Sequence, residues 1–197
     1  MKSFHRSLRA FTLIELLVVI SIILILMGLI APQVMRGFAT GQLAGTLSNA
    51  RSLQVATQTM AMDSFTTGDG PGWPGDSEGG ASWQTFCNDL TNGKYLSSSD
   101  LLKLVAAPGV KVGTAFPPAK SALQVYAVKE NSPNNAIFVS TFNWNNFQAL
   151  APEAVPFGDK GFVIFRKGGD GSVYQARQAT STNALGEMAG AGFAPGP

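Results

Sequence analysis

The side chains that most often perform chemistry in enzymes are almost absent from this chain. Cys87 is the only cysteine and His5 the only histidine among 197 residues. A single cysteine excludes an intrachain disulfide and any zinc site built from several thiolates. Beyond His5 there is no imidazole for Ser-His-Asp or Cys-His catalysis, or for a His-ligated metal site. We therefore predict no catalytic residue and no cofactor, and interpret Cys87 as a small buried hydrophobe.

A glycine-rich segment at residues 167–171 resembles a phosphate cradle in composition only. It reads Lys-Gly-Gly-Asp-Gly. A phosphate-binding loop would be followed by a Lys-Ser/Thr pair and a helix, and neither follows here. Apolar and β-branched residues flank the segment on both sides, which favours a hairpin turn between two strands.

Charge argues against nucleic acid as a partner. The formal net charge is +2, but three of the 14 basic residues lie in the first ten positions, and without them 11 basic side chains face 12 acidic ones. A chain this close to neutral has no long-range field to capture a polyanion. Arg166, Lys167 and Arg177 are the one candidate basic patch, and we interpret them as a solvated strand face, with no nucleic acid expected.

The elements that would position any site are one long helix and a small sheet. An apolar stripe with helical spacing predicts that a helix continues from Pro32 to about Met62. The stripe consists of Leu43, Leu47, Ala50, Leu53, Ala56 and Met60, and Gln42, Asn49, Arg51, Gln54 and Gln58 lie on the other face. The Gly/Pro-rich residues 66–80 end this helix.

Short helices and strands are predicted after that loop. Two helices are expected, one opened by Ser82 and closed near Gly93, the other running from about Asp100 to Val105. Strand patterns follow at residues 122–129, 136–142, 161–166 and 172–176. The Ala/Gly-rich residues from about Thr180 onward are expected to be loose.

The N-terminus carries the strongest signal. Residues 1–10 form a basic head, and residues 11–31 contain a single ionisable side chain, Glu15. Twenty-one helical residues span roughly 30 Å, about the thickness of a bilayer's hydrocarbon core. A secretory signal peptide would be cut near Ala31, but Pro32 would then follow the scissile bond. A plain signal anchor explains the apolar run and the basic head, but not a carboxylate inside it.

The run Ala-Phe-Thr-Leu-Ile-Glu-Leu-Leu-Val-Val-Ile at residues 10–20 closely resembles the prepilin signature of type IV pilins and type II secretion pseudopilins. The resemblance implies cleavage by a prepilin peptidase between Ala10 and Phe11, followed by N-methylation of Phe11. It also implies that Glu15 pairs with the N-terminus of a neighbouring subunit during assembly. Ala10 stands where the family usually has glycine, as does Leu24 within the apolar helix.

The resemblance implies an α+β, pilin-like fold. A long bent N-terminal α-helix, half membrane-spanning and half amphipathic, would pack on a small antiparallel β-sheet. Gly28 and Pro32 are the predicted bend, because proline cannot donate to the carbonyl four residues back. The expected regions are a leader (1–10), a transmembrane and polymerisation helix (11–31), its amphipathic continuation (32–63), a globular α+β head (64–180) and a flexible tail (181–197).

The expected function is structural: a pseudopilin or minor pilin of a type II secretion or type IV pilus filament, and not an enzyme. Its expected partners are the prepilin peptidase, other pilin or pseudopilin subunits, the inner membrane and the assembly platform. The expected location is the bacterial inner membrane, single-pass, with the N-terminus cytoplasmic, and then the filament. The alternative is a signal-anchored extracytoplasmic binding domain that does not polymerise.

Calcium is the metal for which the sequence offers weak candidate ligands. Major pseudopilins use a calcium site in a C-terminal loop, and oxygen-rich loops suit this ion. Asp159 and Asp170 are the candidate ligands, on either side of a predicted strand, and Asp69, Asp76 and Glu78 lie on an earlier loop. No EF-hand spacing is present, so no metal site is assigned.

Overall fold

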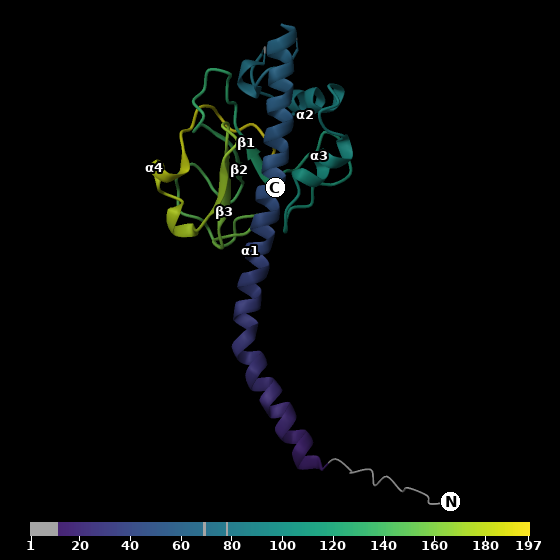
Figure 1. Ribbon diagram of the computed structural model, residues 1–197, viewed down its shortest axis with the longest axis vertical. Coiled ribbons are helices and arrows are strands. Elements are labelled where there is room, and N and C mark those ends of the chain that lie inside the picture. The colour runs from purple at the N-terminus through teal and green to yellow at the C-terminus, as the bar shows by residue number, and fades with distance from the viewer. Residues whose placement is uncertain (1–11, 69, 78) are drawn as a thin grey trace, which may run out of the picture. The chain divides into compact units, whose positions relative to one another are not determined.

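The computed structural model describes residues 12–68, 70–77 and 79–197. The chain divides into two compact units, Met1–Phe38 and Ala39–Pro197. Helix α1 (Leu13–Thr67) contributes residues to both units (Figure 1). The fold is α+β and pilin-like, as predicted: a long N-terminal apolar helix continues into a helix that packs with a small antiparallel sheet.

In the first unit, the helix is apolar from Leu13 to Ala31 except at Glu15 and Ser21. Residues Leu13–Ala31 are long and apolar enough to cross a membrane, and none of this segment is buried within the protein. Its large apolar side chains are between 46 and 88% exposed. The Ser21 hydroxyl donates to the Leu17 carbonyl, 2.8 Å away, so this polar side chain is satisfied within the helix itself. A segment with these properties suits lipid, where each backbone polar group must be satisfied internally.

In the second unit, α1 buries the predicted stripe. Leu43, Ala50, Leu53, Ala56 and Met60 are all buried, and Leu47 packs against them. The predicted polar face was wrong at one position, because the Gln54 side chain is only 1% exposed. Its amide nitrogen donates to the Lys167 carbonyl, 2.9 Å away, and to the Gln58 side chain, 3.0 Å away. A long amide that finds such partners can be buried without leaving its donors unpaired.

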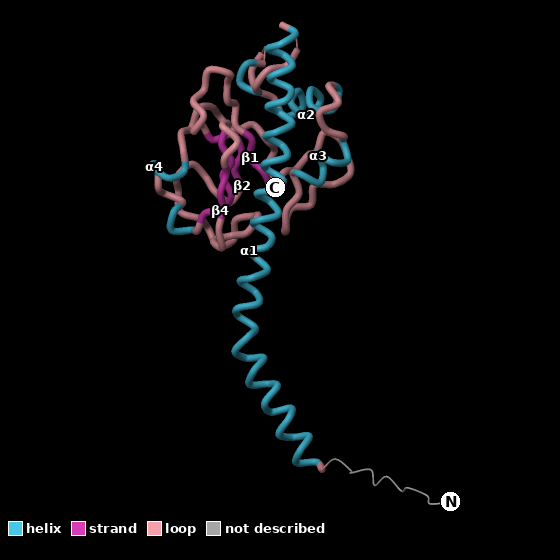
Figure 2. Tube along the Cα trace, viewed as in Figure 1, coloured by secondary structure: helices cyan, strands magenta, loops and turns pink. Residues whose placement is uncertain are grey.

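The sheet is an antiparallel meander in the order β1-β2-β3-β4. Its strands are drawn in magenta in Figure 2. Its strands are β1 (Leu123–Val125), β2 (Ile137–Thr141), β3 (Phe162–Arg166) and β4 (Gly171–Tyr174). All four predicted strands are present. The predicted turn at 167–171 is confirmed, because Phe165 pairs with Gly171 across the β3–β4 hairpin.

The central strands β2 and β3 are covered on both faces. Alternate side chains of β3 enter two separate apolar clusters, Val163 with the cluster that contains α1 residues, and Ile164 with the one that contains Leu185. Leu185 belongs to α4 (Thr182–Leu185), on the side of the sheet away from α1 (Figure 1). Period-two alternation between two covered faces explains why these strands read as continuous apolar runs.

Both predicted short helices form. α2 (Trp83–Asn92) has Ser82 at its N-cap position and Gly93 at its C-cap, as predicted. α3 (Ser98–Leu104) begins earlier than expected, because the Ser97 hydroxyl accepts from the Asp100 backbone N–H and so caps the helix. Two short 3-10 helices, Pro74–Asp76 and Ala176–Gln178, complete the elements described.

The C-terminal tail differs from the loose segment that its composition predicted. Leu185 is fully buried, and Phe193 makes an edge-to-face contact with Phe86 of α2, with ring centroids 5.7 Å apart. The Phe193 N–H donates to the Val125 carbonyl, 3.0 Å away. The tail thus pairs with the edge of β1, and its few large apolar residues anchor a segment that is otherwise glycine- and alanine-rich.

Candidate functional site

The predicted site lies at the start of α1. The expected cleavage and methylation residues, Ala10 and Phe11, fall outside the described residues. Thr12 and Glu15 are described, and Glu15 is the only ionisable residue between Leu13 and Ala31. Gly28 and Pro32 both fall inside α1, and the bend expected at this pair stays a prediction.

Thr12 and Glu15 form a reciprocal cap on the first turn of the helix. The Glu15 carboxylate accepts from the Thr12 backbone N–H, 2.9 Å away, and from the Thr12 hydroxyl, 2.8 Å away. In return the Glu15 N–H donates to the Thr12 hydroxyl oxygen at 3.3 Å. This is a capping box, which satisfies backbone donors that would otherwise have no partner at a helix start.

Sequence reasoning missed the role of Thr12. The signal was present, because Thr12 and Glu15 have the Thr-x-x-Glu spacing of a capping box directly before an apolar run. The box does two things for the site. It fixes the start of the helix, and it gives the carboxylate two donors from its own chain in otherwise apolar surroundings.

The Glu15 carboxylate lies among apolar side chains. Ile14, Val18 and Val19 lie beside it on the helix surface, around a shallow apolar depression. An acidic group in a membrane segment is costly and usually has a specific partner or function. The apolar helix segment thus carries one negative charge near its N-terminal end, which suits recognition of a single positive group.

Fold and site together define a class: a membrane-compatible apolar helix, carrying one capped carboxylate, that continues into an α+β head of pilin type. Residues 6–31 match the family described as the prokaryotic N-terminal methylation motif. The chain therefore carries the signature of type IV pilins and pseudopilins. No curated protein and no solved structure matches the chain.

The interpretation of Arg166, Lys167 and Arg177 as a solvated strand face was wrong for the first two, and the three residues do not form a common exposed patch. Lys167 is only 8% exposed, and its ammonium group donates to the backbone carbonyls of Glu130 and Ser132 and lies 5.3 Å from the centre of the Trp73 ring. The Arg166 side chain is 14% exposed, and its Nε donates to the Leu185 carbonyl. Only Arg177 of the three is exposed.

The calcium candidates are in different settings. The Asp170 carboxylate accepts from the Arg166 guanidinium, which occupies oxygen lone pairs that a cation would need. Asp159 is exposed in a turn before β3. Among the described residues there is no group of three or more His, Cys, Asp or Glu side chains that could hold a metal ion. The absence of an assigned metal site at these aspartates stays a prediction.

Cys87 fits the interpretation of a buried hydrophobe. It is fully buried in the core cluster with Leu90 and Leu101. Burial raises the pKa of its thiol to about 12, because an apolar environment disfavours the thiolate. Since the thiolate is the nucleophile, we expect this cysteine to react slowly in the folded protein.

Proposed function

We propose that this chain is a pseudopilin or minor pilin: a structural subunit that a prepilin peptidase cleaves and N-methylates, and that then joins a type II secretion or type IV pilus filament. The observation that carries the proposal is the methylation motif at residues 6–31, together with Glu15 as the sole charge of an apolar helix. The family is structural rather than catalytic, which agrees with the lack of histidine beyond His5.

The basic leader and the apolar helix support a membrane topology for the precursor. Lys2, Arg6 and Arg9 precede the apolar run. An excess of basic residues on one side of a membrane span marks the cytoplasmic side. The precursor would thus sit in the inner membrane with its leader in the cytoplasm, where the peptidase acts, and with the head outside. The remaining partners are other subunits and the assembly platform.

Glu15 supplies the assembly step of this proposal. Cleavage before Phe11 would create a positive α-amino group at the start of each subunit. A carboxylate in apolar surroundings is unfavourable alone and is compensated when a positive group pairs with it. In a bundle of apolar helices, the Glu15 carboxylate of one subunit and the new terminus of another would pair only at one axial offset. That pairing would set the register of each incoming subunit.

The decisive experiment is mass spectrometry of the N-terminal peptide of membrane-extracted protein, with and without the host's prepilin peptidase. The proposal expects a peptidase-dependent terminus at Phe11, about 14 Da heavier because of one added methyl group. Such a terminus would also show that the peptidase accepts Ala10 before the cleavage site. A terminus at Met1 under both conditions would refute the proposal and leave a signal-anchored binding domain that does not polymerise.

A further inference from the structure

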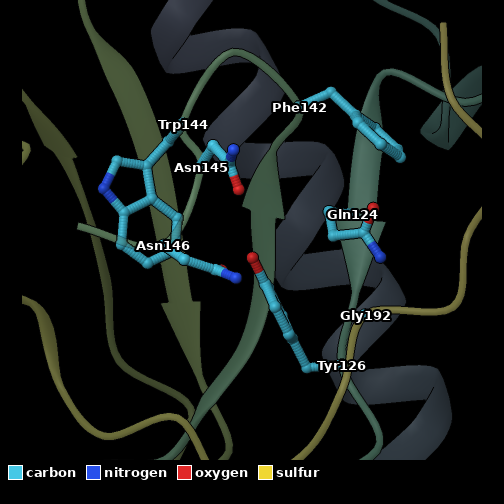
Figure 3. Close-up of a pocket in the computed structure, with 7 residues that line it drawn as sticks. All are labelled: Gln124, Tyr126, Phe142, Trp144, Asn145, Asn146 and Gly192. Carbon is cyan, nitrogen blue, oxygen red and sulfur yellow. The ribbon is translucent and has the colours of Figure 1, made fainter. Parts of the chain in front are cut away.

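The second unit contains a pocket on the face of the sheet away from α1. Seven residues line a cavity of about 400 Å³, which is within the range of roughly 300–1,000 Å³ typical of small-ligand sites. They are Gln124, Tyr126, Phe142, Trp144, Asn145, Asn146 and Gly192. Figure 3 shows the carboxamides of Asn145 and Asn146 pointing toward the space beside Tyr126, with Gln124 on the other side of that ring.

The lining of this pocket is polar but uncharged. Three of its residues are carboxamides, each offering two N–H donors and a carbonyl acceptor. None of the seven is acidic or basic. The one titratable group is the Tyr126 hydroxyl, which shares a hydrogen bond with the Ser140 hydroxyl at 3.0 Å. Burial raises the pKa of Tyr126 to about 12, so it is neutral at physiological pH.

The carboxamides are mostly free to bind a ligand. Within the described part of the chain, the Asn146 side chain makes no hydrogen bond. The Gln124 and Asn145 amides make only long ones, of 3.4 Å each, to the Val125 carbonyl and the Gln148 side chain. Bonds of this length are weak and easily exchanged for better partners.

The backbone beside the pocket is held in an unusual conformation. Asn146 and Phe147 have positive φ angles of 42° and 62°. Asparagine tolerates this region, but for phenylalanine it costs on the order of 1–3 kcal/mol. The Phe147 ring packs edge-to-face on Trp144, with centroids 5.2 Å apart, and so holds the turn in place. The fold thus stabilises a turn that presents two neighbouring amides to the cavity.

We propose that this pocket binds a neutral saccharide. Sugar hydroxyls donate and accept at once, as carboxamides do, and the half-buried Phe142 ring offers an apolar face for the C–H groups of a sugar ring. A charged ligand would find no counter-charge among the lining residues. The site lies wholly in the second unit, so it does not depend on cleavage or assembly.

A peptide strand is the less suitable occupant. Peptides that bind beside a sheet usually add a strand to an open edge. The edge of β1 is already occupied, since Phe193 N–H donates to the Val125 carbonyl and Ala127 N–H donates to the Ala191 carbonyl, at 3.0 and 2.9 Å. Peptide binding is nevertheless an outcome that the experiment below can detect.

Saturation-transfer NMR on the full chain tests this proposal. The protein is held in an amine-oxide detergent, because detergents with sugar headgroups would compete for the site. The probes are lactose, maltotriose and chitotriose, with sialyllactose as the charged counterpart of lactose, at up to roughly 10 mM. An uncharged peptide of similar size is the last probe. We expect signals from at least one neutral sugar and none from the peptide.

Two pocket variants and one matched control locate the binding. Asn146→Gly removes the carboxamide while keeping a residue that adopts positive φ without strain, so folding is preserved. Gln124→Ala removes a second amide. Each should weaken binding roughly three- to tenfold, the effect of losing one hydrogen-bonding group. Gln84→Ala makes the same chemical change at an exposed position of α2, and should leave affinity unchanged.

Gly192→Ala offers an independent perturbation. A Cβ at this position would lie 2.1 Å from the Gln124 amide nitrogen, so that flexible side chain must move within the pocket. Binding should weaken as for Gln124→Ala. The proposal is overturned if no neutral sugar gives a signal, if only sialyllactose or the peptide does, or if all variants bind as the parent does.

Discussion

Replacing Arg166 by methionine should detach the C-terminal segment from the sheet while the strands remain folded. The Arg166 Nε donates to the Leu185 carbonyl at 3.0 Å, and Nη2 donates to the Ala184 carbonyl and the Tyr174 hydroxyl, both at 2.7 Å. The remaining Nη1 contacts the Asp170 carboxylate. One guanidinium on β3 therefore holds both the end of α4 and the end of β4.

The expected loss of stability is about 2–4 kcal/mol. Hydrogen bonds to a charged group contribute about 1.5–3 kcal/mol each and are not additive around one side chain. The ion pair adds little, at most about 1 kcal/mol, because the Asp170 side chain is 63% exposed. Methionine keeps most of the apolar stem, so the lost donors dominate the change. For a unit of this size, the melting temperature should fall by roughly 5–15 °C.

Thermal unfolding of the full chain in detergent measures the loss, and limited proteolysis locates it. The variant should be cleaved first after residue 180, ahead of the sheet. Arg177→Met is the matched control, because Arg177 is exposed. Asp170→Asn separates the ion pair from the backbone contacts and should cost less than about 1 kcal/mol. If Arg166→Met melts and is cleaved like Arg177→Met, these contacts do not hold the tail.

Three further predictions concern the helix and the core. Glu15→Ala and Glu15→Gln should both insert into membranes yet yield few filaments in a shearing assay, although glutamine can still accept from Thr12; normal assembly by the glutamine variant would show that the charge is not needed. Cys87 should resist iodoacetamide at about pH 8 until the protein is denatured. Its raised pKa should also lower the free energy of unfolding as pH rises from 9.0 toward about 12, because in this range the thiol ionises in the unfolded chain but not in the folded one. Leu53→Ala, at a fully buried position, should cost about 2–5 kcal/mol in urea unfolding, whereas Val55→Ala, 53% exposed, should change stability by less than about 0.5 kcal/mol.

Periodicity was enough to predict most of the helices and strands, whereas their pilin-like arrangement was implied by the family resemblance. The α1 stripe repeats every three to four residues and the strands are dense in β-branched and aromatic residues, so each element shows its buried side locally. What failed was what depends on a distant partner. Gln54 is buried because a carbonyl 113 residues away accepts its amide. The tail is ordered because Phe193 and Leu185 meet α2 and the sheet, which composition cannot reveal.

The candidate sites divide in the same way. The methylation motif and Glu15 are readable because their residues are consecutive and lie on one helix. Thr12 was equally local and could have been found from its spacing to Glu15. The amide-lined pocket was not predictable, because Gln124, Asn146 and Gly192 come from three separate segments that only the folded sheet and its tail bring together.

The two units of the chain differ in what they need from their surroundings. The second unit buries its own core, with Leu53 and Phe138 fully covered. None of the apolar helix Leu13–Ala31 is buried by the rest of the described protein, so it needs either lipid or other apolar helices around it. On the proposed function, transfer from lipid into a bundle of such helices would exchange one apolar environment for another.

Glu15 is then the group for which the two environments differ. Among the described residues, Thr12 is the one that donates to the carboxylate within its own chain. In a bundle of processed subunits, a neighbour's α-amino group would add a full opposite charge in the same low-dielectric surroundings. On the proposed function, the apolar helix makes both states accessible, and the unequal compensation of a single carboxylate favours the assembled one.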